Sequence, residues 1–316
     1  MNKYERYFRF SRMTSRVVLS SIHRSLEIKR GQEPTSMLYS SAFLPVIERM
    51  GIRKGSDKEK IARKLVHSIL QYWFMADAML DKDSVYSKMD EEILTQNIQD
   101  ALNSQLFNDI NMPLEIKRRI EEMEIDARRK AYVAHSEFMA KFNPSTSPFE
   151  EVLEYRIDTT GLFGETIVDA LNIVSGKKQD VATFKDEMLN ASLCLQMLDD
   201  LVDYVSDYRK EDPNLFYALT SENPTERTKL KIASANQFIL DTKRPYEIAQ
   251  VYAPNTLLSY IRKLESMSSN LPPYMKKFIL DTLATIPYVS FTPNSSIDRF
   301  NRSEMKKIIA KKTKVD

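Results

Sequence analysis

The sequence predicts an all-α protein, and three observations support this. Apolar side chains recur at helical spacing along nearly the whole 316-residue chain. Glycine is scarce, with only six residues, so there are few of the tight turns that join β-strands. Prolines stand close to the ends of the periodic segments, where helices begin and end. We expect a single domain over 1–316, a bundle of about ten or more helices with a site built in its core.

Each helix follows from an apolar-periodic segment with punctuation at its ends. In chain order, we expect helices at 3–29, 36–50, 56–82, 87–108, 113–142, 148–175, 181–211, 224–241, 254–270, 273–285 and 295–312. The ends at 1–12 and 306–316 are basic and are expected to be flexible. The first helix places arginines beside aromatic residues, which fits either an ordinary amphipathic helix or a helix on a membrane surface.

Composition excludes several classes of function. The formal net charge of +2 gives no footprint for nucleic acid. The single Cys194 excludes an internal disulfide framework and suits a reducing, cytoplasmic compartment. None of the three histidines shares a helical turn with another histidine or with the cysteine, so a zinc site is not expected. No apolar run is long enough for a transmembrane helix, and no Gly-rich nucleotide-binding loop is present.

The most informative stretch is Leu195–Asp207, LQMLDDLVDYVSD, which contains no helix breaker. At about 100° per residue, one stripe of this helix is polar and the opposite stripe is apolar. The polar stripe consists of Gln196, Asp199, Asp200, Asp203 and Asp207. Carboxylates four residues apart repel each other, and no cation lies in the stripe before Arg209. A solvated acidic face is one interpretation; we favour a site for Mg2+ and a diphosphate, because hard cations bind carboxylate oxygens.

A second acidic element is Tyr72–Asp83, YWFMADAMLDKD. Asp77 and Asp81 lie one helical turn apart within an almost continuous apolar run, and Asp83 follows. A carboxylate buried there without a partner would be strongly unfavourable. Asp77 could be capped or paired locally. Metal ions shared with the first acidic helix would instead explain both acidic elements together.

The third element is Tyr155–Gly164, YRIDTTGLFG, where two of the six glycines fall inside a predicted helix. An interior glycine destabilises a helix by up to about 1 kcal/mol relative to alanine. Close packing against a neighbouring helix would explain the glycines, and so would a break that directs backbone groups into a cavity. Arg156 stands just before them, where it could bind a diphosphate in bidentate fashion or form a surface ion pair.

Together these elements resemble the class I isoprenoid synthase superfamily, over roughly residues 65–215. The QxxDDxxD pattern that begins at Gln196 is similar to the second motif of chain-elongating prenyl diphosphate synthases, but their DDxxD first motif is missing. The squalene and phytoene synthases carry DxxxD in both places, as Asp77/Asp81 and Asp203/Asp207 do here.

Two further traces of the superfamily lie in the glycine-containing element. Its YxxxxxGxxG pattern, formed by Tyr155, Gly161 and Gly164, is similar to that of the squalene and phytoene synthases. Arg156, Thr159 and Gly161 look like the RxxTxG segment of terpene cyclases, although Asp replaces the usual NSE-type second motif of those enzymes.

The resemblance implies an α-helical barrel around an apolar cavity, with three Mg2+ ions held between two acidic helices at its mouth. The catalytic residues that it implies are Asp77, Asp81, Asp203, Asp207 and Arg156. The implied metal ligands are Asp77, Asp81, Asp199, Asp200, Asp203 and Asp207. The implied substrate-binding residues are Arg156, Tyr155, Thr160, Gly161, Gln196, Phe74, Phe163, Tyr204, Arg209 and Lys210.

These residues predict a Mg2+-dependent class I terpenoid synthase. It would ionise a linear prenyl diphosphate of farnesyl or geranylgeranyl size to an allylic carbocation, which it would cyclise. Three alternatives remain: head-to-head condensation of the squalene or phytoene kind, chain elongation, and a helical lipid- or partner-binding protein without activity. A homodimer and a peripheral membrane contact are compatible with the sequence.

Overall fold

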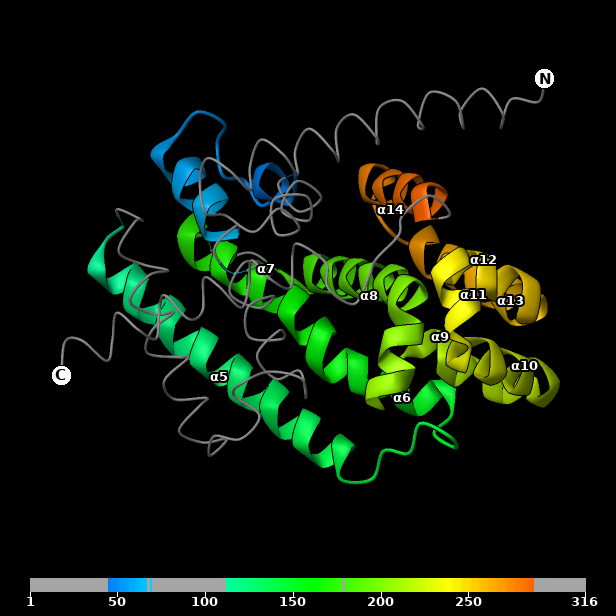
Figure 1. The fold of residues 1–316 in the computed structure, drawn as a ribbon. Coiled ribbons are helices and arrows are strands. Elements are labelled where there is room, and N and C mark those ends of the chain that lie inside the picture. The colour runs from blue at the N-terminus through cyan, green and yellow to red at the C-terminus, as the bar shows by residue number, and fades with distance from the viewer. Residues whose placement is uncertain (1–44, 67–68, 70–111, 178–179, 287–316) are drawn as a thin grey trace, which may run out of the picture. The chain divides into compact units, whose positions relative to one another are not determined.

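The computed structural model describes residues 45–66, 69, 112–177 and 180–286, and in these ranges all regular structure is helical (Figure 1). The prediction of an all-α protein is confirmed there. Residues 45–49 and 57–66 are helical. The helices that follow are α5 (Leu114–Met139), α6 (Phe149–Arg156), a π-helix η1 (Ile157–Gly161), α7 (Leu162–Ser175), α8 (Ala182–Lys210), α9 (Leu215–Leu219), a 3-10 helix η2 (Thr220–Glu222), α10 (Pro224–Ala235), α11 (Gln237–Thr242), α12 (Pro245–Tyr252), α13 (Pro254–Ser269) and α14 (Pro273–Thr285).

The described chain forms two compact units. The first contains residues 129–164 and 185–286, and the second contains 45–66, 69, 112–128, 165–177 and 180–184. Within the described part of the chain, no helix is long and apolar enough to cross a membrane. One domain over 1–316 stays a prediction.

Several predicted helices end within one to three residues of the observed ones, among them 113–142, 181–211, 254–270 and 273–285. The predicted helix 224–241 is instead two helices, because Asn236 leaves the helical conformation and its side chain accepts a hydrogen bond from the Ile239 N–H. The short helices α9 and α12 were not predicted. The predicted helices 3–29, 87–108 and 295–312, and most of 36–50 and 56–82, lie outside the described residues.

The core of the first unit is built around α8. Tyr260 of α13 is fully buried and donates a hydrogen bond to the Met197 carbonyl at 3.0 Å. Tyr204, also fully buried, donates to the carbonyl of Pro245 at 2.9 Å. The ring of Phe216 contacts both tyrosines, with centroids 4.9 and 5.3 Å away. Because tyrosine hydroxyls must find partners when buried, these bonds fix α8 in one orientation against α9, α12 and α13.

The second unit uses lysines to complete the carbonyl ends of its helices. Lys58 donates from Nζ to the Ser175 carbonyl, the last residue of α7, at 2.7 Å. Lys177 donates from Nζ to the Gly51 carbonyl at 3.0 Å. Positive charges are favourable at helix C-termini, where backbone carbonyls lack intrahelical partners. Segments far apart in the sequence are joined in this way.

Candidate active site

The glycine-containing element is a continuous helical segment that widens for one turn. Helix α6 passes into the π-helix Ile157–Gly161, and α7 continues from Leu162. Thr159 donates from its hydroxyl to the carbonyl of Tyr155 at 2.8 Å, which satisfies one acceptor at this turn. The expected helix break is therefore a π turn. Such single turns are rare in proteins and are frequently found at functional sites.

Gly161 and Gly164 differ in how much space a side chain would have at each position. A β-carbon on Gly164 would lie 2.5 Å from both the Met188 carbonyl oxygen and the Ser192 hydroxyl of α8. A β-carbon on Gly161 would lie 3.2 Å from the side chain of Leu189 and 3.7 Å from the Arg156 carbonyl oxygen. Gly164 thus allows close packing against α8, and Gly161 sits in the π turn. The close packing expected from the sequence is confirmed at Gly164, whereas a break that directs backbone groups into a cavity stays a prediction.

Asp200 is the centre of the polar contacts at this site. Its side chain is 1% exposed, and it lies at the edge of the expected polar stripe, on the buried side. One carboxylate oxygen accepts hydrogen bonds from Arg156 at 3.3 Å and from the Gln196 amide at 2.6 Å. The other accepts from the backbone N–H of Leu215 at 2.6 Å. These protein donors engage both oxygens of Asp200, so its surroundings differ from those of the exposed Asp199.

The chain reversal after α8 makes these contacts possible. Glu211 has a left-handed conformation, with φ of 60°, and the Asp212 N–H reaches back to the Asp207 carbonyl at 2.8 Å. This pattern ends a helix and turns the chain sharply. The carbonyl of Pro213 then accepts a hydrogen bond from Arg156 at 2.7 Å. Arg156 is held between the acidic helix and the residues that follow it.

Asn214 ties this return segment to the acidic helix. It is buried, and its amide nitrogen donates to the Asp200 carbonyl at 2.8 Å and to the Asp207 carboxylate at 2.7 Å. Its amide oxygen accepts from the Tyr217 N–H at 2.9 Å and so caps α9. Sequence analysis missed Asn214. The signal was present, since an Asn directly before an apolar run is a preferred helix N-cap.

A link of hydrogen bonds joins the π-helix to α8. Thr160 donates from its hydroxyl to the Gln196 amide oxygen at 3.2 Å, and the amide nitrogen of Gln196 reaches Asp200. The residues of the π turn and the QxxDD segment are therefore in direct contact. Because each of these side chains orients the next, the position of Arg156 depends on Asp200 and, through it, on Gln196 and Thr160.

Acidic side chains are concentrated along α8. Burial raises the pKa of Asp207 well above its usual range, and the charges of Asp203 and Asp200 raise this pKa further, while the hydrogen bond from Asn214 opposes them. Burial also raises the pKa of Asp200, against the opposing charge of Arg156. A group of carboxylates that resists ionisation is one that a cation would stabilise.

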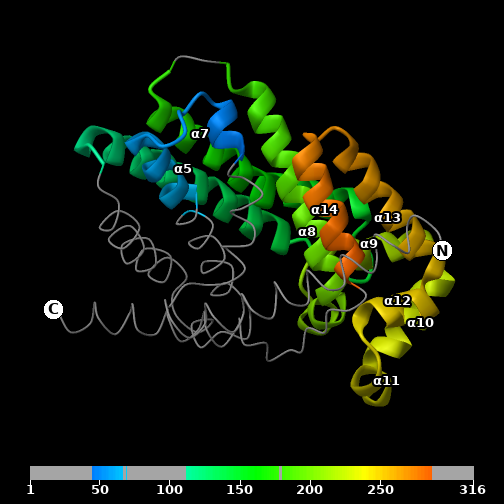
Figure 2. The ribbon, with the colours of Figure 1, turned by 90° about the horizontal axis from the view of Figure 1, so that it is seen from above.

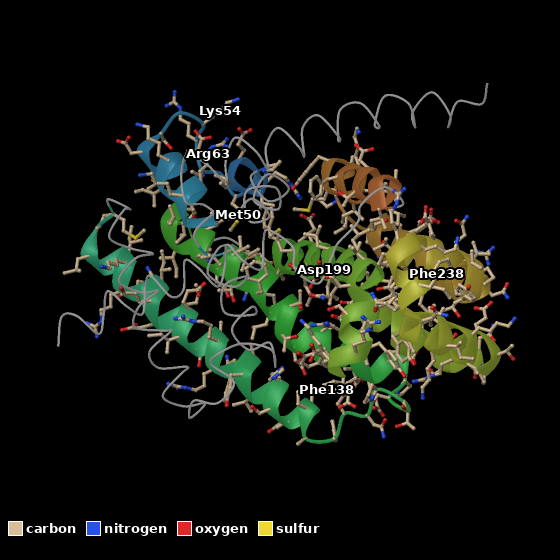
Figure 3. All side chains as sticks on the ribbon, viewed as in Figure 1. Met50, Lys54, Arg63, Phe138, Asp199 and Phe238 are labelled. Carbon is tan, nitrogen blue, oxygen red and sulfur yellow. The ribbon has the colours of Figure 1, made fainter. Side chains whose placement is uncertain are left out.

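The other predicted residues of this helix and its surroundings lie as follows. Asp199, labelled in Figure 3, is exposed on α8, and Asp203 is half-buried. At the C-terminal end of α8, Arg209 is exposed and Lys210 is half-buried. Phe163 is buried in α7, and Tyr204 is part of the core. The hydroxyl of Tyr155 lies 3.0 Å from His135 Nδ1, and its ring stacks on Phe138 of α5.

The second acidic element, Tyr72–Asp83, lies outside the described residues, and with it Asp77, Asp81, Asp83 and Phe74. Among the residues that the structure does describe, no group of three His, Cys, Asp or Glu side chains is arranged to hold a metal ion. The chemistry of the acidic helix nevertheless fits a hard divalent cation, since Asp203 and Asp207 offer carboxylate oxygens one turn apart in a field of like charge. The convergence of the two acidic helices stays a prediction.

Comparisons with known proteins add little to this geometry. No protein-family model matches the sequence. No curated protein matches it either. A solved structure, the geranylgeranyl pyrophosphate synthetase from Pyrococcus horikoshii Ot3, is similar over 98% of this chain and 99% of that chain, with 18% identity and a TM-score of 0.47. We therefore base the function on the contacts described above.

Proposed function

We propose that this protein is a Mg2+-dependent class I isoprenoid synthase that ionises a prenyl diphosphate. One observation carries the proposal: Arg156, next to the π turn, pairs with Asp200 inside the acidic helix. This contact brings together two of the three sequence elements that resemble the superfamily. The carboxylates would bind divalent cations and the guanidinium beside them would bind phosphate oxygens, as a diphosphate substrate with its cations requires.

The residues divide into two groups by their surroundings. Asp203 and Asp207, with the exposed Asp199, would hold Mg2+ together with Asp77 and Asp81 of the second acidic element. When bound, Mg2+ would supply Lewis-acid stabilisation of the diphosphate as it leaves. The number of ions, which the resemblance puts at three, remains part of the proposal.

Arg156 binds the leaving diphosphate in this proposal. Its guanidinium is planar and carries several donors, so it can bind phosphate oxygens while keeping a partner in the protein. Asp200 and the Pro213 carbonyl orient it. A donor held in advance at the place where negative charge develops favours the transition state over the ground state. Asp200 is then a positioning residue rather than a metal ligand.

The allylic group could then undergo chain elongation or cyclisation, and one observation favours each reaction. The Thr160–Gln196–Asp200 link uses the QxxDD residues that resemble chain-elongating synthases. This favours elongation, in which a second, homoallylic diphosphate attacks through its double bond and loses a proton. The position of Arg156 against the acidic helix favours the second candidate, cyclisation, which the sequence predicted first.

Incubation with geranyl, farnesyl or geranylgeranyl diphosphate and Mg2+, with and without the five-carbon isopentenyl diphosphate, tests the proposal. Elongation gives a longer diphosphate only when the five-carbon partner is added. Cyclisation gives a hydrocarbon or an alcohol from one allylic substrate alone. Two allylic units joined head to head would identify the squalene or phytoene type. No product from any combination would contradict the proposal and favour the non-catalytic alternative.

A further inference from the structure

Between Glu226 and Glu247, basic residues outnumber acidic ones over the stretch that comprises most of α10, all of α11 and the two residues that follow it. Residues 227–244 contain five basic residues and one acidic residue, a formal charge of +4, whereas the whole chain carries +2. Arg227 and Arg244 are already engaged, the first with the Pro144 carbonyl and the second with Glu247. Lys229, Lys231 and Lys243 are exposed. In the described part of the chain no carboxylate pairs with any of these three lysines.

Large apolar side chains are exposed among these lysines. Ile232 is 64% exposed and Phe238 is 75% exposed, and the polar or small residues between them, 235–237, are exposed as well. Figure 2 shows α11 at the free end of the group that it forms with α10 and α12, and Figure 3 labels Phe238 there. An exposed apolar side chain gains free energy only where a partner removes it from water. We call Lys231, Ile232, Phe238 and Lys243 the basic apolar tip.

We propose that the basic apolar tip docks on an anionic lipid surface. Charge complementarity carries this choice, because exposed lysines close in sequence to two exposed apolar side chains match a bilayer interface, where anionic headgroups overlie acyl chains. A protein partner would be expected to cover a broader apolar patch. The inference goes beyond the proposed function and does not depend on it, since it concerns a surface of α10 and α11 and not the acidic helix.

Co-sedimentation of the full chain with vesicles tests the proposal. We expect binding to vesicles of phosphatidylcholine mixed with the anionic phosphatidylglycerol, and much weaker binding to phosphatidylcholine alone. The variant Ile232→Ser/Phe238→Ser should lose most of this binding. Each of Lys231→Gln and Lys243→Gln should weaken it by roughly fivefold, and raised salt should weaken it further. The matched control is Val133→Ser/Leu258→Ser, which removes apolar side chains exposed by 47% and 48% elsewhere.

A fluorescent label on an introduced cysteine would report directly whether the basic apolar tip contacts the vesicles. Cys194 is fully buried, and burial raises the pKa of its thiol to about 12, so it should not react with a maleimide. Ala235→Cys then provides a single reactive thiol at the exposed junction of α10 and α11. A polarity-sensitive fluorophore at this position should shift to shorter wavelength with anionic vesicles, and one at Val133→Cys should not.

Three results would overturn the proposal. The wild-type chain could fail to bind anionic vesicles. The Ile232→Ser/Phe238→Ser variant could bind them as well as the wild type, which would place the contact elsewhere, for example in the basic ends of the chain. The wild type could also form dimers that this variant does not form, which would identify a second copy as the occupant. Neither sedimentation nor fluorescence depends on turnover, so failure here is distinguishable from failure of the proposed function.

Discussion

At the scale of single residues, two aspartates that are adjacent in the sequence have different surroundings. Asp199 is exposed, whereas Asp200 is buried and accepts hydrogen bonds from Arg156, Gln196 and the Leu215 N–H. A helical projection places both at the edges of one polar stripe. It cannot say which edge the rest of the protein covers, and it cannot foresee donors that come from a return segment such as Asn214–Leu215.

The substitution Asp200→Asn should separate the roles of these two residues. It leaves Arg156 buried without its charged partner and places an amide donor against other donors, so we expect a loss of about 3 kcal/mol in the free energy of unfolding. Diphosphate release should also fall at temperatures where the variant remains folded, because Arg156 is no longer oriented. Urea unfolding and product assays measure the two effects.

The control for this experiment is Asp199→Asn. Because Asp199 is exposed, its replacement should change stability by less than about 0.5 kcal/mol. Equal losses of stability in the two variants would contradict the assignment of Asp200 as a positioning residue.

Glu124 of α5 gives the stability a pH dependence. It is 2% exposed, and burial raises the pKa of its carboxyl from 4.5 to about 8. Between these two values the folded protein holds a proton that the unfolded chain has lost. The free energy of unfolding should therefore fall as the pH rises, by up to about 1.4 kcal/mol per pH unit from this group.

Urea unfolding across about pH 5 to 8 measures this slope. The variant Glu124→Gln cannot ionise and should show a flatter dependence over the same range. A variant with the wild-type slope would mean that other groups cause the dependence. Asp200 and Asp207, whose pKa values are also raised, would then be the first to examine.

At the scale of elements, the π turn and the close packing of α7 against α8 place Arg156 beside the acidic helix. Sequence analysis found the segment because its glycines are costly in a helix. It could not distinguish a break from close packing, since that depends on the backbone of α8 at Met188. Apolar periodicity was enough to predict the positions of α5, α8, α13 and α14 to within three residues. The short α9 and α12 were not, because each is too short for a periodic pattern to be recognised.

The substitution Gly164→Ala tests the close packing. The added methyl group would lie 2.5 Å from a backbone carbonyl of α8 that cannot move alone. We expect a loss of about 2–3 kcal/mol in the free energy of unfolding, from overpacking. Gly161→Ala is the matched control, since its one tight contact, at 3.2 Å, is with the flexible Leu189 side chain and it gains helix propensity. Similar stabilities of the two variants, measured by urea unfolding, would argue against close packing at Gly164.

Because Glu211, just after α8, has a left-handed conformation, we expect one substitution there to stabilise the protein. Glu211 is exposed with φ of 60°, a conformation that costs a residue with a β-carbon about 1–2 kcal/mol. Glu211→Gly should therefore raise the free energy of unfolding by about 1 kcal/mol. Glu211→Ala retains the β-carbon and should give no such gain. If the two variants unfold at the same urea concentration, the conformation of residue 211 is not what limits stability.

At the scale of the whole molecule, all regular structure in the described chain is helical, and the elements that carry the site lie in its first unit. Composition and periodicity were enough to predict the helical class. The position of the acidic helix α8 beside Arg156 and the return segment could not be read from spacing alone. It depends on the π turn, on Glu211 and on Asn214, none of which has a periodic signature.

The release of inorganic diphosphate from farnesyl diphosphate tests the central claim most directly. We expect Mg2+-dependent release by the wild-type chain. Asp203→Asn should abolish it without unfolding the protein, because this variant removes a charge from a repulsive group. Arg156→Lys should lower kcat more than it raises KM, because a lysine cannot reproduce the planar fork. Release that is independent of Mg2+, or that continues at the wild-type rate in Asp203→Asn, would contradict a diphosphate site on the acidic helix.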